Sequence, residues 1–117
     1  MLMPGDVVTA LFIHSDASGR KVRPALVVSS EDFNQETRHV ILAAISTKPV
    51  KDRFDVMLEK WKEAGLRFPS KVRVGKLVTV DARLVRKIGS LVPGEAIKSL
   101  ALARTIIARP ESMTGSD

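Results

Sequence analysis

The sequence predicts a mainly β domain: a small, strongly curved antiparallel sheet or partial barrel of about five strands, with short helical turns and a C-terminal helix. Short β-branched and apolar runs alternate with turn formers along most of the chain, and helical apolar spacing is sustained only near its end. A chain of 117 residues has room for one core. We therefore expect one domain over residues 1–110 and a polar, disordered tail at 111–117.

The first half of the chain contains three predicted strands. Residues 6–13 are rich in β-branched residues and end at a cluster of turn formers. The next strand begins near Arg23, because Pro24 cannot donate a ladder hydrogen bond and belongs at a strand start or an edge. A nearly continuous apolar run then predicts a buried strand over residues 39–47.

Two further strands are predicted in the second half. One covers residues 54–58, and the other covers residues 71–81, where apolar side chains alternate with polar ones. Gly75 interrupts this alternation, and Lys76 follows it. A glycine inside an alternating strand often marks a bulge, which would direct Lys76 away from the core.

Three short helical segments are expected between the strands. Ser30 is placed to cap a turn that closes at Asn34. Residues 59–64 have helical composition, with Gly65 placed to end the helix. Residues 82–87 are expected to form one more helical turn.

The terminal helix follows Gly94 and ends at Arg109–Pro110. Its apolar residues recur at helical spacing, which predicts one face packed on the sheet. The residues of this face are Ala96, Leu100, Ala103 and Ile107.

The basic charge of the chain is concentrated in one segment. The formal net charge is +6, and the stretch from Arg67 to Lys87 holds seven cations against the single carboxylate of Asp81. Such a segment is either a solvated face or a surface for a polyanion. With one Trp, four Phe and no Tyr, there are few aromatic side chains on which unpaired bases could stack.

Several classes of site are excluded by composition and motif. The absence of Cys removes disulfides, thiolate metal sites and Cys nucleophiles, and two histidines are too few for a His-based metal site without carboxylates. No phosphate-cradling glycine loop or metal-binding helix motif occurs, and neither does a nucleophile elbow. No signal peptide or membrane-spanning run is present, so we expect a cytoplasmic protein without metal or cofactor.

An ordered set of short motifs resembles the PemK/MazF family of toxins across about residues 4–108. The resemblance implies an SH3-like barrel and a homodimer. It also implies a metal-independent endoribonuclease that cuts single-stranded RNA at short sequences and is inhibited by a cognate antitoxin protein. The motifs are Pro4-Gly5-Asp6-Val7-Val8, Arg23-Pro24-Ala25-Leu26-Val27-Val28-Ser29, Val40-Ile41-Leu42-Ala43-Ala44-Ile45-Ser46, Val72-Arg73, Leu77-Val78-Thr79-Val80-Asp81 and Ile88-Gly89.

By position in these motifs, Arg23 matches the active-site arginine of the family and Ser46 its active-site threonine, with Thr47 as a neighbour. Attack of an RNA 2′-hydroxyl on the adjacent phosphate builds negative charge on the nonbridging oxygens, and the products are a 2′,3′-cyclic phosphate and a 5′-hydroxyl. A guanidinium can donate two parallel hydrogen bonds to such oxygens, and a serine hydroxyl adds a neutral donor.

The proton-transferring group is left open by the sequence. Some family members carry a carboxylate two residues after the arginine equivalent to Arg73, where this chain has Gly75. His14 has a suitable intrinsic pKa and lies in the loop 14–22, which is expected to help select the RNA sequence. The residues expected to contact the RNA backbone are Arg20, Lys21, Lys71, Arg73 and Lys76.

Two other functions are weighed against cleavage. A barrel that binds nucleic acid without cutting it is compatible with the missing carboxylate at Gly75. Gyrase-poisoning toxins share the fold, but they use a terminal tryptophan, and this chain ends Gly115-Ser116-Asp117.

Overall fold

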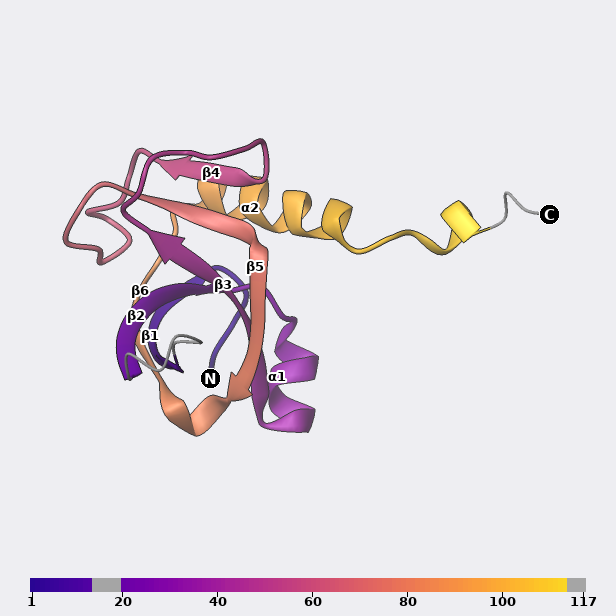
Figure 1. Ribbon diagram of the computed structural model, residues 1–117. Coiled ribbons are helices and arrows are strands. Elements are labelled where there is room, and N and C mark those ends of the chain that lie inside the picture. Colours follow the sequence, from indigo (N-terminus) through magenta and orange to yellow (C-terminus); the bar gives the residue numbers. More distant parts are fainter. Residues whose placement is uncertain (14–19, 114–117) are drawn as a thin grey trace.

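The computed structural model describes residues 1–13 and 20–113, and in this part of the chain the strands form one bent, open sheet (Figure 1). Neighbouring strands are antiparallel in the order β4-β5-β3-β2-β1-β6, so β4 and β6 form the two edges. The mainly β fold class is confirmed. The strands are β1 (Asp6–Ile13), β2 (Arg20–Val27), β3 (His39–Ser46), β4 (Asp55–Leu58), β5 (Ser70–Asp81) and β6 (Val85–Ser90).

The strand β6 is one more than the sequence predicts. Instead of a helical turn over residues 82–87, a single 3-10 turn, η1 (Ala82–Leu84), is followed directly by β6. The prediction was wrong because β6 is an edge strand with mostly exposed side chains, so it shows no apolar alternation. Its backbone is nevertheless paired with β1.

A bulge bends β5, as Gly75 predicts. Ala43 of β3 is opposite Leu77, but the next residue, Ala44, is opposite Arg73, so residues 74–76 are inserted between two successive pairs. Lys76 is exposed at this point. Figure 1 shows β5 bent at this point. Val72 and Val74, before the bulge, belong to one apolar cluster of the core, and Val80, near the end of the strand, packs against the other.

Side chains on both faces of the central strands are buried. Neighbouring residues such as Val7 and Val8 of β1 belong to different apolar clusters, because alternate residues point to opposite faces. The first cluster, around Leu26 and Val72, lies under the segment 59–66 that follows β4 and under the C-terminal helix. The second, around Val27 and Leu42, is enclosed by the curl of the sheet itself.

The turn residues 59–65 do not form the predicted helix. They make successive turns, and the backbone N–H of Gly65 donates to the carbonyl of Lys62. The carboxylate of Glu95 accepts hydrogen bonds from the N–H groups of Glu59 and Lys60, which holds the segment in this non-helical form. Trp61 is half-buried and packs against the first cluster.

The cap predicted at Ser30 is confirmed, but the helix it begins is longer than one turn. Ser30 Oγ accepts from the N–H of Phe33, and α1 (Glu31–Thr37) continues until Arg38, which has a φ of 59°. Asn34 is a residue of α1, and its side chain is buried.

The C-terminal helix is α2 (Pro93–Ile106), and it ends before the predicted stop at residue 109. Ala96 and Ala103 pack on the core as predicted, whereas Ile107 follows the last helical residue and is 65% exposed. The buried face also includes Ser99. Beyond α2 the chain runs outward through η2 (Pro110–Met113), and residues 114–117 of the expected tail lie outside the described residues (Figure 1).

Candidate active site

Arg23 and Ser46 belong to the same face of the sheet, with Ser46 at the end of β3 and Arg23 inside β2, just past its ladder with β3. In the ladder between β2 and β3, Ala25 is opposite Ala44. Arg23 precedes Ala25 by two residues and Ser46 follows Ala44 by two, and residues two apart in a strand share a face. The ladder ends at the Ala25–Ala44 pair, so Arg23 and Ser46 flank the point where the two strands separate.

The surroundings of this pair leave a cation and a hydroxyl at the surface. Arg23 is exposed and is opposite Ala10 of β1. Ser46 is half-buried, and its Oγ accepts a hydrogen bond of 3.1 Å from the backbone N–H of Lys48. This contact uses Oγ as an acceptor, so the hydroxyl proton can be donated elsewhere. Thr47 follows the end of β3 and is exposed.

Lys71 is opposite Ser46 in the ladder between β3 and β5, but its ammonium is buried rather than exposed. Nζ lies 2.7 Å from a carboxylate oxygen of Asp55 and donates to the carbonyl of Pro49 at 2.5 Å. The side chain is 3% exposed. Lys71 therefore offers no charged surface to an RNA backbone, contrary to what its place in an alternating strand suggests.

Asp55, in β4, is a charged group at the site that the sequence interpretation missed. Burial favours its neutral form, but the hydrogen bonds from Lys71 and from the N–H of Lys51, with the charges of Lys71 and Arg73, outweigh burial and lower the pKa of Asp55. In the sequence Asp55 is one polar residue at the start of a short strand. Nothing in that pattern indicates that β4 lies beside β5.

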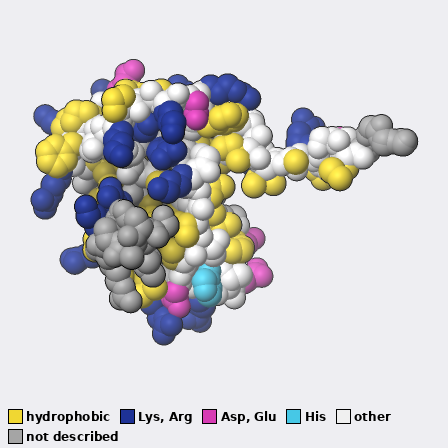
Figure 2. Space-filling model, viewed as in Figure 1, with side chains coloured by type: hydrophobic (Ala, Val, Ile, Leu, Met, Phe, Trp, Pro, Cys, Tyr) yellow, Lys and Arg dark blue, Asp and Glu magenta, His cyan; other side chains and the backbone are white. Residues whose placement is uncertain are grey.

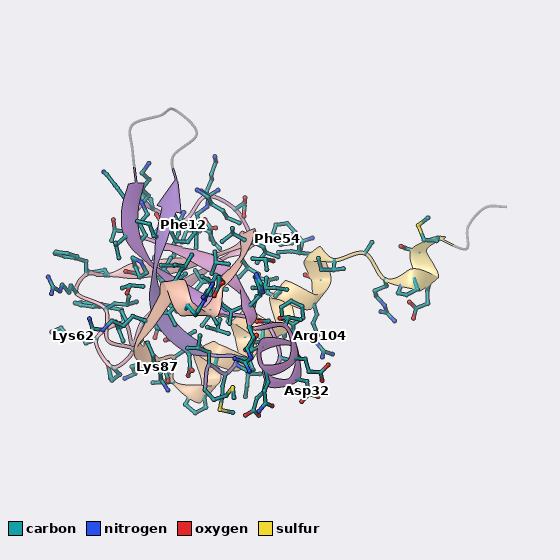
Figure 3. The ribbon with its side chains drawn as sticks, turned by 90° about the horizontal axis from the view of Figure 1, so that it is seen from below. Phe12, Asp32, Phe54, Lys62, Lys87 and Arg104 are labelled. Atoms are coloured by element: carbon teal, nitrogen blue, oxygen red, sulfur yellow. The ribbon has the colours of Figure 1, made fainter. Side chains whose placement is uncertain are left out.

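Arg73 and Lys76 line a hollow of about 500 Å³ between the β5 bulge and the end of α2. Phe54, Asp55 and Ile106 form other parts of its wall. Phe54 lies beside α2 in the view from below (Figure 3). Lys and Arg side chains gather over β3 and the first half of β5 on the face shown in Figure 2. Arg73 therefore lies between this cationic face and the hollow.

The basic segment of the sequence is not one continuous surface in three dimensions. It runs through β5, η1 and β6, and β6 is at the opposite edge of the sheet from β4 and β5. Some of its charges are paired as well: Arg83 binds Asp81 at 2.9 Å, and Lys87 binds Asp6 at 3.2 Å. Both carboxylates also make structural hydrogen bonds, since Asp81 caps η1 and Asp6 accepts from the N–H of Met3.

The remaining predicted site residues lie around the first loop. Lys21 is exposed and is opposite Phe12, on the same face as Arg23. Arg20 begins β2, and its side chain is outside the described part of the molecule. His14 also lies outside the described residues, so its expected role stays a prediction. Among residues 1–13 and 20–113, no group of three His, Asp or Glu side chains is arranged to hold a metal ion.

The described helices are all too short or too polar to span a membrane.

Comparison with solved structures shows that this fold has many relatives. The chain aligns with an endoribonuclease in complex with its cognate antitoxin from a Mycobacterial species, with a TM-score of 0.69 and 16% identity, over 93% of this chain and 100% of the other. A MazE-MazF structure from Deinococcus radiodurans aligns with a TM-score of 0.73 and 17% identity, over 90% and 94%. The Mycobacterium tuberculosis toxin MazF-mt6 aligns with a TM-score of 0.67 and 21% identity, over 88% and 99%. No curated protein sequence matches the chain.

The sequence comparison with protein families is more specific than these likenesses, which at such identities establish the fold alone. The family model of the PemK-like, MazF-like toxins of type II toxin-antitoxin systems matches residues 3–104, which covers the whole sheet and nearly all of α2. Members of this family are generally endoribonucleases that form complexes with antitoxins. The chain therefore belongs to the PemK/MazF family of toxins.

Proposed function

We propose that this protein is a toxin endoribonuclease that cleaves single-stranded RNA at short sequences without a metal ion. The observation that carries the proposal is the register between β2 and β3, which assigns Arg23 and Ser46 to one face beside the point where the ladder between these strands ends. In a member of the PemK/MazF family, a cation and a hydroxyl donor on one face support a site in which both bind the same phosphate.

The chemistry needs few protein groups. The 2′-oxygen attacks the adjacent phosphorus, the bond to the 5′-oxygen breaks, and the products are a 2′,3′-cyclic phosphate and a 5′-hydroxyl. The nucleophile is already tethered to the reacting phosphate, so positioning and charge stabilisation contribute much of the rate. Arg23 binds the nonbridging oxygens, and Ser46 donates a further hydrogen bond. The group that accepts the 2′-proton is not assigned.

The same proposal includes a cognate antitoxin that covers the basic face and a homodimer as the active form. Both follow from membership of the family, and two of the similar structures are complexes of a toxin with its antitoxin. Substrate and inhibitor would meet in the cytoplasm.

The proposal is tested by incubating the purified protein with unstructured RNA in the presence of EDTA and analysing the fragment ends. We predict that Arg23→Ala lowers the cleavage rate by about 10²–10³-fold, which is the usual effect of removing one charge-stabilising donor. Arg86→Ala, at the exposed β6 edge, is the matched control and should cut at the wild-type rate. Cleavage that stops in EDTA would contradict the metal-free mechanism, and an active Arg23→Ala variant would remove Arg23 from the site.

A non-catalytic RNA-binding protein is the second candidate, and Gly75 favours it because β5 carries no carboxylate there. RNA that is bound but left intact by the wild-type protein would support this candidate over the nuclease.

A further inference from the structure

Asp55 joins three parts of the proposed site through one carboxylate. In the ladder between β4 and β5 it is opposite Arg73, and Lys71 is two residues away from Arg73 on the same face. Its Oδ2 accepts 2.7 Å hydrogen bonds from Lys71 Nζ and from the N–H of Lys51. Its Oδ1 lies 4.0 Å from Nε of Arg73. The Asp55 side chain is only 4% exposed and that of Lys71 3%, so this ion pair is shielded from water.

Two of these contacts fix the chain that follows Ser46. The Lys71 backbone is opposite Ser46, and the Lys71 ammonium reaches forward to the carbonyl of Pro49. The N–H of Lys51 is bound directly by Asp55. A single buried carboxylate thereby holds the loop after β3 at two points, which restricts where the Ser46 hydroxyl can lie.

The third contact concerns Arg73, which shares a face with the proposed site. Arg73 is opposite Ala44, and Ala44 is opposite Ala25, so its side chain is on the face of Arg23 and Ser46. At 4.0 Å the carboxylate attracts the guanidinium without a close hydrogen bond, and the Arg73 side chain stays 37% exposed. The Arg73 guanidinium is thus oriented by the buried carboxylate of Asp55, and its exposed part remains free to bind a phosphate.

We propose that Asp55 is a positioning residue of the ribonuclease site, which directs Arg73 toward the RNA phosphate and holds the loop that places Ser46. This inference rests on the proposed function. The role is not that of a general base, because Asp55 is buried and its oxygens are already bound by cationic and backbone donors.

The test must separate positioning from folding. Removing Asp55 alone leaves the Lys71 ammonium buried without a counter-charge, which destabilises a protein strongly. Replacing both members by apolar residues of similar size is often tolerated or stabilising, so Asp55→Leu/Lys71→Met is the informative variant. Glu36→Gln is the control, since Glu36 is an exposed carboxylate of α1 and does not line the hollow.

Unfolding in urea and steady-state cleavage of unstructured RNA are measured for the wild-type protein and these variants. We expect Asp55→Leu/Lys71→Met to be as stable as the wild type, with kcat lowered about 100-fold, the effect of a misplaced catalytic arrangement. KM should change little, because the cations that bind RNA are still present. Glu36→Gln should behave as the wild type. A doubly substituted protein that is stable and cuts at the wild-type rate would show that the pair serves folding alone.

A second measurement tests whether Asp55 acts through Arg73. Adding Arg73→Ala to the double variant should cause much less further loss than Arg73→Ala causes alone, because coupled residues are not additive. If Arg73→Ala lowers kcat by the same factor in the wild type and in the double variant, Asp55 does not act through Arg73. The Arg73 Nε–H signal in NMR, assigned with Arg73→Lys, should shift and broaden in the double variant. A wild-type protein that fails to cut would overturn the proposed function, whereas an unchanged Arg73 signal would overturn the positioning role whether or not the protein cuts.

Discussion

Gly65 and Gly89 pack backbone against backbone where the turn residues 59–66 meet β6. Gly65 has a φ of +89°, and a Cβ there would lie 2.5 Å from the carbonyl oxygen of Ile88. We predict that Gly65→Ala lowers the free energy of unfolding by about 1–3 kcal/mol or more, since the left-handed conformation alone costs this much for a residue with a Cβ. Gly94→Ala is the control, because no atom lies within 4 Å of its added Cβ. Equal urea midpoints for the two variants would contradict the close contact.

The carboxylate of Asp81 makes the stability of the protein depend on pH at the acidic end of the scale. The hydrogen bonds from the side chain and the N–H of Arg83 lower the pKa of Asp81 from 3.8 to about 2. Because the folded pKa is depressed, the stabilisation is fully present above about pH 4 and is lost as the pH falls toward 2. We predict that Asp81→Asn flattens the loss of thermal stability over this range. Thermal unfolding between pH 2 and 7 measures it, and an unchanged acid slope would show that the pair contributes nothing.

At the scale of one element, α2 carries a polar group where the core needs an apolar one. Ser99 is fully buried on the face of α2 that packs on the sheet, and its Oγ has no hydrogen-bond partner among residues 1–13 and 20–113. We predict that Ser99→Ala raises the free energy of unfolding by about 1 kcal/mol, because it removes an unsatisfied hydroxyl. Ala101→Ser, on the exposed side of the same helix, measures helix preference alone. If Ser99→Ala raises the free energy of unfolding by no more than Ala101→Ser lowers it, helix preference explains the whole change and burial of the hydroxyl contributes nothing.

The elements that the sequence predicts correctly are those with a local signal. Ser30 and Gly75 each restrict their own backbone, and they mark a cap and a bulge as expected. The strand start predicted near Pro24 is wrong, because β2 begins at Arg20 and Pro24 lies inside it, next to the point where the ladder with β3 ends. The turn residues 59–65 and β6 are predicted wrongly because distant partners determine their conformation: Glu95 binds the turn, and β1 pairs with β6. Propensity within a window cannot register such contacts.

The same distinction applies to the site. Arg23 and Ser46 were selected by motif, and the strand register assigns them to one face. Their roles stay predictions. Lys71 and Asp55 could not be interpreted from sequence, because the alternation of β5 gives the face of Lys71 but not the carboxylate that β4 places over it. A charge count along the sequence therefore overstates the cationic surface of this segment.

At the scale of the whole molecule, the fold sorts the basic residues into those that line the proposed site and those that do not. Lys76 is exposed on the bulge and lines the hollow beside Arg73. Arg83 lies in η1, beyond the other end of β5, and is bound to Asp81. Lys76 and Arg83 have equal formal charge, but only Lys76 lies where it could bind an RNA strand that also contacts Arg23 and Arg73.

The salt dependence of RNA binding distinguishes these two places. Each phosphate neutralised by a cation contributes a slope of about 0.7 to the fall of log affinity with log salt for a single strand. We predict that Lys76→Ala reduces this slope by about 0.7, whereas Arg83→Ala leaves it unchanged. Fluorescence anisotropy with 2′-O-methyl RNA measures binding without cleavage, because the attacking oxygen is blocked. Equal reductions in both variants would mean that the RNA follows overall charge rather than the face that holds Arg23, and the assignment of the site to that face would then fail.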